Sequence, residues 1–301
     1  MKNIILVSVS GGKDSQAVLN YCLKKYSKEK LIAYFCDTGW EAPETYEHLK
    51  YLEDTLKIEI IRVKSDKYEN FEDMCIKRKS FPSRVRRFCT EELKIIPSTK
   101  FIKSYIKKGY KVKNYVGVRK EESKSKKLTT PNIINGVEWL ITPKRDVENK
   151  YKTVFLGLLP KPTKRKDGSY SYPKKAKEFY SKNNSVTTVQ PIIDFKEKEV
   201  YTYNIKSGTN NNPLYSKGCT RVGCFPCVNA NNNELGMLPQ DRIDRVVALE
   251  KKVQAVNKNA KPVFLYKKAG ELKSFDYHCS NLKFNTLGLD LGCINHLGIC
   301  E

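Results

Sequence analysis

The chain of 301 residues has no long apolar run and no internal repeat. No segment approaches the roughly twenty consecutive apolar residues that a membrane-spanning helix needs. No charged and then apolar leader precedes the first apolar segment, which begins near residue 3. We therefore expect a soluble, cytoplasmic protein with no membrane partner, which folds as one large α/β domain or as a domain with an appendage.

A phosphate-binding loop of the Walker type, G-x-x-x-x-G-K-[ST], is also absent. Instead, the apolar residues 4–9 lead into Ser10-Gly11-Gly12-Lys13-Asp14-Ser15, which we call the SGGKDS loop, and a helix-like segment follows over residues 16–26. Consecutive glycines let ligand oxygens approach the main-chain N–H groups, and the helix directs its positive end to the same point. Lys13 adds a full charge, and two serines add hydroxyl donors. The loop is therefore predicted to bind an anion, and a polyphosphate suits it best.

Strand-like and helix-like segments alternate over residues 1 to about 130. Strands are predicted over residues 3–9, 31–36, 58–63 and 112–118, and further helices over residues 43–56 and 94–108. This alternation favours an α/β fold with a doubly wound parallel sheet, helices on both faces and a ligand at the carboxyl ends of the strands. Residues 131–188 are irregular and rich in Lys, Tyr and Ser, which indicates a basic insertion. Beyond it, we predict a strand over 187–195 and helices over 196–205 and 240–257.

A second motif follows the predicted strand 31–36, and with the SGGKDS loop it points to a known family. The loop resembles the SGGxDS sequence of the PP-loop ATP pyrophosphatases, also called adenine nucleotide alpha-hydrolases, which cleave ATP between the α and β phosphates. Residues 37–45, with the sequence DTGWEAPET, are similar to the DTGxExPET motif of the phosphoadenosine phosphosulfate (PAPS) reductase family. Further segments continue the family pattern in order, at residues 87–94, 117–123, 190–195 and 212–215.

This resemblance covers about residues 3–230 and implies both a fold and a nucleotide site. The implied fold is a Rossmann-like nucleotide-binding domain over residues 1–230, followed by a helical, cysteine-containing appendage over residues 231–301. The implied ligand is ATP or adenosine phosphosulfate, with its phosphates on the SGGKDS loop. Lys13 and Arg119 would stabilise charge on the phosphates, and Asp14 would hold a bridging Mg²⁺. The residues implied to bind the nucleotide are Ser10, Gly11, Gly12, Lys13, Asp14, Ser15, Asp37, Thr38, Gly39, Gly117 and Arg119.

The ten cysteines do not suit a disulfide framework in a chain that shows no secretory leader. Cys219, Cys224 and Cys227 follow a C-x4-C-x2-C pattern, a spacing that plant-type iron–sulfur proteins use together with a fourth, remote thiolate. We expect Cys89 to be the fourth ligand. The APS reductases and the DNA-phosphorothioation relatives of the family hold a [4Fe-4S] cluster with cysteines at comparable places. Zinc, or thiols without metal, are the alternatives. Three other cysteines are expected to be small buried hydrophobes: Cys22, Cys36 and Cys75.

The tail lacks the Glu-Cys-Gly-Leu-His motif that carries the nucleophilic cysteine of the reductases. This departure counts against plain sulfonucleotide reduction. Cys293 and Cys300 flank His296, and a neighbouring imidazolium favours the thiolate, so we predict a redox or persulfide-carrying pair. A structural clip at the end of the chain is the alternative. His48 and His278 are assigned to packing or to the surface, without a catalytic role.

Positive charge dominates the chain, with 56 Lys and Arg against 33 Asp and Glu and a net charge of +23. Such a balance suits a polyanionic partner, and tRNA or DNA is the class we predict. A bias of composition toward lysine, and the needs of a nucleotide site, are alternative reasons for the charge. The basic residues gather in three clusters, at residues 77–87, 124–127 and 161–177. Aromatic residues are interleaved in the third cluster, which suits base stacking, although a solvated insertion loop fits it equally well.

Taken together, these features predict ATP-dependent adenylation followed by sulfur transfer to a nucleic acid or nucleotide. The first alternative is a sulfonucleotide reductase, in which the same loop holds adenosine phosphosulfate and a tail cysteine attacks the sulfur. The second alternative is a regulatory module that binds a nucleotide and keeps a structural zinc. The predicted partners also include a sulfur donor or a thioredoxin-like protein, and a second copy of the chain, because related enzymes often pair.

Overall fold

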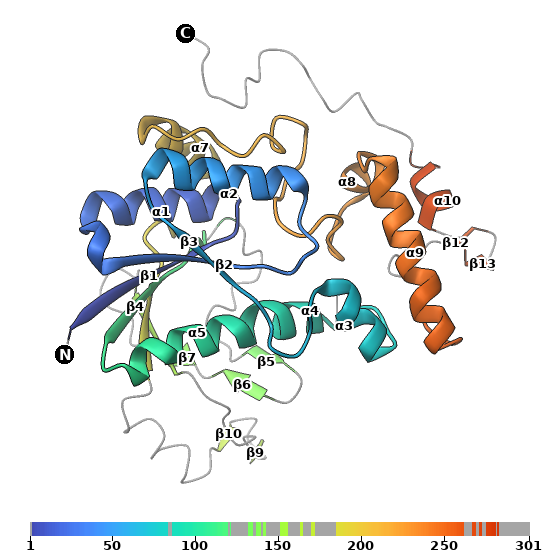
Figure 1. Cartoon of the computed structure of the whole chain (residues 1–301), viewed down its shortest axis with the longest axis horizontal. Helices are drawn as coiled ribbons and strands as arrows, with labels where there is room; N and C mark the ends of the chain where they lie inside the picture. Colours follow the sequence, from blue (N-terminus) through green and yellow to red (C-terminus); the bar gives the residue numbers. More distant parts are fainter. Residues whose placement is uncertain are drawn as a thin grey trace.

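Figure 1 shows the fold in a computed structural model of the chain, with a twisted β-sheet between helices. The structure describes residues 2–83, 86–119, 121, 132–134, 137–139, 141–142, 151–155, 163–164, 170–171, 185–261, 267–268, 271–272, 275–280 and 282. Among the helices in these ranges, none combines the length and the apolar character that crossing a membrane requires.

Seven strands form the main sheet, in the order β3-β2-β1-β4-β11-β8-β7. Five of them are parallel: β1 (Asn3–Val9), β2 (Leu31–Cys36), β3 (Ile60–Val63), β4 (Lys111–Tyr115) and β11 (Ser185–Val189). The strand order reverses its direction between β1 and β4, which is where open α/β sheets bind ligands. The predicted α/β fold with a doubly wound parallel sheet is confirmed for this part of the chain.

Helices cover both faces of the sheet, which explains why residues 4–9 are almost continuously apolar. Ile5, Val7 and Val9 pack in one core with α1 (Lys13–Lys25), α2 (Pro43–Leu56) and α7 (Glu197–Lys206). Ile4 and Leu6 alternate with them and pack on the opposite face, in a core that includes Ile102 of α5 (Ile96–Lys107). Figure 1 shows α1, α2 and α7 on one side of the sheet and α5 on the other.

A further core lies beyond the carboxyl edge of the sheet. It joins α3 (Phe71–Arg78), α8 (Asn232–Gly236), α9 (Gln240–Val256) and α10 (Phe275–Ser280). Trp40, from the loop after β2, lies in the same core as Val246 of α9 and Phe275 of α10. The appendage is mainly helical where it is described, with one short antiparallel pair of strands, β12 (Lys267–Lys268) and β13 (Glu271–Leu272), and its helices pack against residues of the nucleotide-binding part. The division of the chain at residue 230 stays a prediction.

Several predicted boundaries move by a few residues, each for a local reason. The strand predicted over 58–63 begins at Ile60, after Lys57 has taken a left-handed conformation with φ of 52°. The helix predicted from residue 94 begins as α5 at Ile96, with Pro97 in its first turn, after α4 (Phe88–Thr90) and the π-helix η2 (Glu91–Ile95). The strand predicted over 187–195 is β11, and it ends before Pro191, which has no amide to continue the ladder.

The insertion over residues 131–188 is not wholly irregular, which corrects the prediction. Its strand β8 (Tyr151–Phe155) pairs antiparallel with β11, and β7 (Ile141–Thr142) pairs antiparallel with β8. Further short strands form two-stranded ladders of their own, β5 (Asn132–Ile134) with β6 (Val137–Trp139) and β9 (Thr163–Lys164) with β10 (Tyr170–Ser171). The sheet is therefore mixed, because the insertion widens it beyond its parallel strands.

Candidate functional site

The SGGKDS loop lies at the carboxyl edge of the sheet, between the end of β1 and the start of α1. Val9 pairs with Phe35 of β2, and Val7 pairs with Tyr115 of β4, so the segments that follow these three strands meet at one edge. These segments are the loop itself, Asp37–Gly39 after β2, and Gly117–Arg119 after β4. The structure therefore brings the predicted nucleotide-binding residues to the same edge of the sheet.

Hydrogen bonds set the shape of the loop. Ser15 Oγ accepts from the Ser10 amide at 2.9 Å and donates to the Gly12 carbonyl at 2.9 Å. The Lys13 amide donates to the Tyr215 hydroxyl at 3.1 Å, and Asn212 Nδ2 donates to the Gly11 carbonyl at 3.0 Å. Among the described residues, the amides of four loop residues have no hydrogen-bond partner: Gly11, Gly12, Asp14 and Ser15. The loop thus presents several main-chain donors at a helix N-terminus, an arrangement that suits an anion.

Two glycines are required by the geometry around the loop. Gly11 has a φ of 76°, and a Cβ there would lie 2.6 Å from Cγ2 of Thr45 on α2. A Cβ on Gly117 would lie 2.7 Å from the Ser15 amide nitrogen and 2.7 Å from the Asp14 carbonyl carbon. The segment after β4 therefore passes against the loop backbone at a distance that only glycine allows.

Lys13 and Arg119 place two buried cations beside Asp14. The Lys13 ammonium lies 3.7 Å from Asp14 and 3.0 Å from Glu197 of α7, and it lies over the rings of Tyr215 and Tyr201 at 4.7 and 5.4 Å from their centroids. The Arg119 guanidinium bonds Asp14 through Nε and Glu121 through Nη1. The Lys13 and Arg119 side chains are 4% and 3% exposed, whereas those of Glu197 and Glu121 are about half exposed.

The motif after β2 mainly builds a turn around a buried carboxylate, Glu41. Thr38 donates to Glu41 through its hydroxyl at 2.7 Å and its amide at 3.2 Å, and the Tyr46 hydroxyl donates to it at 3.1 Å. Asp37 lies nearer the surface and accepts from the Gly39 amide at 3.0 Å and the Tyr46 hydroxyl at 2.7 Å. Gly39 has a φ of 64°, which explains the glycine at this position. The other Asp37 oxygen lies 3.4 Å from the exposed Lys64 ammonium, and the Thr38 side chain is bonded to Glu41.

The cysteine-rich loop is attached to this turn. Glu41 and Cys224 form an antiparallel β-bridge, and the Phe225 amide donates to the Trp40 carbonyl at 2.8 Å. The same loop approaches the SGGKDS loop, because the Val222 carbonyl oxygen lies 3.8 Å from the position of a Cβ on Gly12. The predicted sulfur residues and the predicted nucleotide residues are thus neighbours.

Three of the four predicted metal ligands lie around Lys94. The Cys224 thiol lies 3.8 Å from Glu41, whose carboxylate lies 4.0 Å from the Lys94 ammonium. Lys94 interacts electrostatically with both Cys224 and Cys227, and its pKa is raised chiefly by Cys224. Burial raises the pKa of Cys224 to about 11, and burial together with Cys227 raises the pKa of Cys89. These thiols are protonated near neutral pH, so a metal would have to displace their protons.

Cys219 packs with Ala42 and Leu214, in a different core cluster from Cys89 and Cys224. Burial, followed by the charges of Glu234 and Glu44, raises the pKa of its thiol to about 11. In the described parts of the chain, no group of three or more His, Cys, Asp and Glu side chains is arranged to hold a metal ion. As placed, the four cysteines do not form a closed ligand set, and the metal centre stays a prediction.

The remaining predicted residues divide into buried, exposed and undescribed ones. Cys22 and Cys75 are fully buried and Cys36 is half-buried, with its thiol 3.5 Å from the Lys94 carbonyl. His48 is buried against Gln16 at 3.0 Å, in agreement with a packing role. In the first basic cluster, Arg78 pairs with Glu92, while Lys77, Lys79, Arg86 and Arg87 are exposed. Cys293, Cys300 and the second basic cluster lie outside the described residues, and only residues 163–164 and 170–171 of the third cluster are described.

Sequence reasoning missed several side chains that shape the site. Tyr215 and Asn212 lie in a segment that the family pattern marks, but the pattern does not show that they support the SGGKDS loop about two hundred positions earlier. Lys94 ends another segment of the family pattern, and no pattern of charges in the sequence indicates that it lies near the cysteine thiols. Glu197 begins α7 and has no local signal for its pairing with Lys13.

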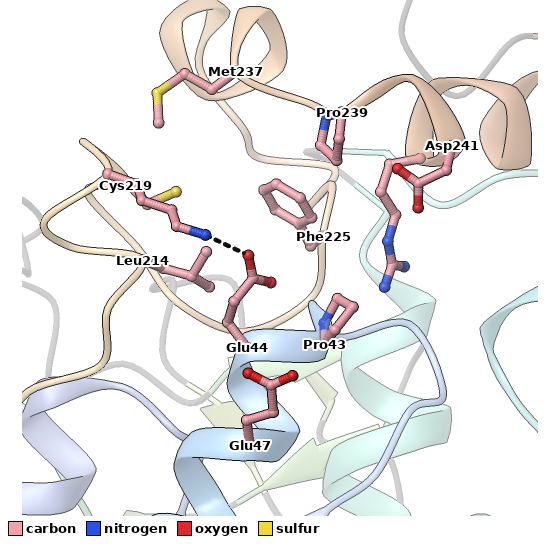
Figure 2. Close-up of a pocket in the computed structure, with 11 residues that line it drawn as sticks. Pro43, Glu44, Glu47, Leu214, Cys219, Phe225, Met237, Pro239 and Asp241 are labelled. Carbon is pink, nitrogen blue, oxygen red and sulfur yellow. Dashed lines mark hydrogen bonds and ion pairs between the residues drawn. The ribbon is translucent and has the colours of Figure 1, made fainter.

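A cavity in the described part of the structure lies away from the residues of the SGGKDS loop. It lies beside the cysteine-rich loop, between the start of α2 and the start of α9, and Cys219 lines it together with Glu44 and Arg242. Figure 2 shows Cys219 on the cysteine-rich loop and Glu44 at the start of α2.

Fold and site together define an α/β protein with a loop of the PP-loop type at the switch point of a largely parallel sheet. The chain belongs to the phosphoadenosine phosphosulfate reductase domain family, whose model matches residues 4–230. The resemblance stated from the motifs is therefore confirmed.

The similar proteins are distant. An uncharacterized protein of Methanocaldococcus jannaschii is 27% identical over 241 residues, which is 80% of this chain but 39% of that protein. An uncharacterized 37.8 kDa protein of Escherichia phage 186 is 26% identical over 310 residues, covering 87% of this chain and 78% of that protein. The chain thus spans well under half of the archaeal relative.

Solved structures with a similar arrangement are also remote. PAPS reductase from Candida auris, in a phosphate complex, aligns with a TM-score of 0.44 and 13% identity, over 74% of this chain and 82% of that one. FMN adenylyltransferase from Candida glabrata, in complex with FMN and an ATP analogue, aligns with a TM-score of 0.38 and 15% identity, over 73% of this chain and 53% of that one.

Proposed function

We propose that the chain is an enzyme that binds ATP at the SGGKDS loop and cleaves it between the α and β phosphates. The observation that carries this proposal is the pair of buried cations, Lys13 and Arg119, beside a loop in which four amides have no partner among the described residues. Buried cations and fixed amides stabilise phosphate charge more strongly than exposed ones, because water screens them less.

A bound polyphosphate could replace the carboxylates that pair with these two cations. Glu197 and Glu121, which bond Lys13 and Arg119, are half-exposed carboxylates, so water can solvate them once they release the cations. A polyphosphate can replace them at little cost and brings more negative charge. Asp14 remains between the two cations and fixes their positions.

Asp14 is also the carboxylate that would hold a Mg²⁺ ion. Magnesium usually takes one or two protein carboxylates, while substrate phosphates and water supply the other oxygens. The single carboxylate at this loop fits that pattern, although Arg119 already bonds one of its oxygens. Such an ion would supply charge neutralisation on the phosphates.

The proposed first step is an adenylation. An oxygen of the substrate attacks the α-phosphorus and forms a new P–O bond, while the bond to the bridging oxygen breaks and pyrophosphate leaves with the electron pair. Lys13 and Arg119 stabilise the charge that develops on the phosphates. A sulfur nucleophile then attacks the activated carbon and displaces AMP, which gives a thiolated nucleic acid or nucleotide.

The neighbourhood of the cysteine-rich loop supports the sulfur step. Cys224 and Cys227 lie in the loop that approaches Gly12, and Lys94 carries a positive charge beside them. A predicted [4Fe-4S] cluster, with zinc as the alternative, would involve Cys89, Cys219, Cys224 and Cys227. Because the described cysteines are not arranged as a ligand set, we derive no step through a cluster. A sulfur donor, a thioredoxin-like protein, tRNA or DNA, and a second copy of the chain remain proposed partners.

Nucleotide binding by the full chain tests the first half of the proposal. Calorimetric titration with ATP and Mg²⁺ should show saturable binding, which Lys13→Gln and Arg119→Gln each weaken at least about tenfold, as expected when a charged hydrogen bond is lost. Lys24→Gln is the matched control, because it removes the same charge from the exposed side of α1. Equal binding by the control and the site variants would refute the assignment.

Product analysis separates the alternatives. Pyrophosphate and AMP in equal amounts, formed when total tRNA or DNA is supplied with ATP, support the sulfurtransferase. Sulfite release from adenosine phosphosulfate or its 3′-phosphate, driven by a thioredoxin, supports the reductase instead. ATP binding without either product supports the regulatory module.

Metal analysis after anaerobic purification tests the centre. Iron with an equal amount of sulfide, and loss of both in Cys224→Ser, support the cluster. Zinc without iron would refute it.

A further inference from the structure

A cavity of about 560 Å³ lies between α2, the cysteine-rich loop and the start of α9. This volume is within the range of about 300–1,000 Å³ that small-molecule pockets occupy. Its apolar wall consists of Leu214, Phe225 and Met237, with Pro43 and Pro239 beside them. Figure 2 shows Met237 and Pro239 facing the α2 residues Pro43 and Glu44 across this space, with Phe225 between them.

Arg242, in the first turn of α9, contributes a buried cation to the cavity. Its side chain lines the cavity, and the residue is only 7% exposed. Nη2 donates to the Glu41 carbonyl at 2.9 Å, but Nη1 is buried and has no hydrogen-bond partner among the described residues. A buried, charged donor without a partner costs more than about 1–3 kcal/mol, and few native structures retain one. The unpaired Nη1 atom therefore favours an acceptor at this place, and the charge of the guanidinium favours an anionic one.

The other charges around the cavity limit what that anion can be. Lys217 is paired with Glu44 at 2.8 Å, so these two charges offset each other at the cavity lining. Glu47 and Asp241 are exposed carboxylates at the cavity lining, and they repel a ligand that carries two negative charges. One guanidinium donor and an apolar wall suit a single negative charge on an apolar body.

From these observations we propose that this cavity is a binding site for a small monocarboxylate with an apolar body. The carboxylate accepts a hydrogen bond from Arg242 Nη1, and the apolar body packs against Phe225 and Met237. Met237, Pro239 and Arg242 all follow residue 230, where the match to the family domain ends. The site is thus built partly by the appendage, and it is separate from the nucleotide site proposed above.

Methionine methyl NMR on the full chain provides a direct test, because the sequence has only three methionines. Met237 lines the cavity, while Met74 is fully buried in the core with α3 and serves as an internal reference. With 3-phenylpropanoate as the probe, the Met237 signal should shift in a saturable way and the Met74 signal should not. The neutral isostere 3-phenylpropanamide should bind at least about tenfold more weakly, because it offers no charge to Arg242.

Variants then test the role of Arg242. Arg242→Gln should weaken 3-phenylpropanoate binding at least about tenfold, whereas Lys252→Gln, which removes an exposed charge from the same helix, should leave it unchanged. If Arg242→Gln does not fold, the comparison of acid and amide on the unaltered chain still decides the question. No saturable Met237 shift, or equal affinity for the acid and the amide, would overturn the proposal. L-Phenylalanine tests the ligand class further: tighter binding than 3-phenylpropanoate assigns the site to amino acids, and weaker binding to simple carboxylates.

Discussion

Gly117 offers the sharpest test of the nucleotide site, because it lies against the backbone of the SGGKDS loop. A Cβ at this position would be 2.7 Å from the Ser15 nitrogen and 2.9 Å from the Asp14 carbonyl oxygen. Ordinary contacts of a Cβ begin at 3.4 Å, so in Gly117→Ala the two segments must separate by about 0.7 Å. Both partners of the clash are main chain, so no side-chain rotation can relieve it.

Two consequences follow for Gly117→Ala. Overpacking of this kind lowers the free energy of unfolding by about 1–3 kcal/mol. A displacement approaching 1 Å of groups that position a substrate lowers a rate by about 100-fold. We therefore expect a folded but less stable protein that binds ATP weakly and forms pyrophosphate about 100-fold more slowly.

Gly109→Ala is the matched control for this experiment. Gly109 follows α5 with a φ of 83°, and a Cβ there would meet nothing within 4 Å. Its replacement costs about 1–2 kcal/mol through backbone strain alone, so both variants lose similar stability. Urea unfolding gives the stabilities, and calorimetry gives the ATP affinities. Two outcomes would refute the reasoning: both variants bind ATP as tightly as the unaltered chain, or both lose ATP affinity equally. In either case the close approach of Gly117 does not matter for nucleotide binding.

Two further predictions concern the support of the loop. Burial lowers the pKa of His48 from 6.5 to about 4, so the folded protein resists protonation there. Its contribution to stability is complete above about pH 6.5 and is lost by up to about 3 kcal/mol as the pH falls to about 4. Urea unfolding of His48→Gln should show a smaller loss between these pH values, and an unchanged loss would contradict the assignment. Tyr215→Phe leaves the Lys13 amide without the hydroxyl acceptor at 3.1 Å, which should lower the free energy of unfolding by about 1–3 kcal/mol. Tyr201→Phe is the control in the same urea experiment, because the Tyr201 hydroxyl has no hydrogen bond among the described residues. If both variants lower the free energy of unfolding equally, the role of Tyr215 is refuted.

Local patterns were sufficient for much of the fold. The apolar run over residues 4–9, the glycine pair and the helix after it predict the first strand, loop and helix, because each depends on neighbouring residues. The same holds for β2, α2 and α9, whose bounds match the predictions closely. The strands of the insertion escaped prediction because β8 gains its hydrogen bonds from β11, about thirty residues away, rather than from local contacts.

The sequence by itself determined that an SGGKDS loop follows the first strand of an α/β sheet, because glycine freedom and apolar periodicity are local properties. The tertiary structure decided what surrounds the loop. Three contacts join segments that are distant in the sequence: Gly117 with Ser15, Glu197 with Lys13, and the Tyr215 hydroxyl with the Lys13 amide. It also placed Cys224 beside Glu41 through a β-bridge, and left the described residues without a group of three or more side chains arranged to hold a metal. The unpaired Arg242 donor likewise exists only because α9 packs over the turn after β2.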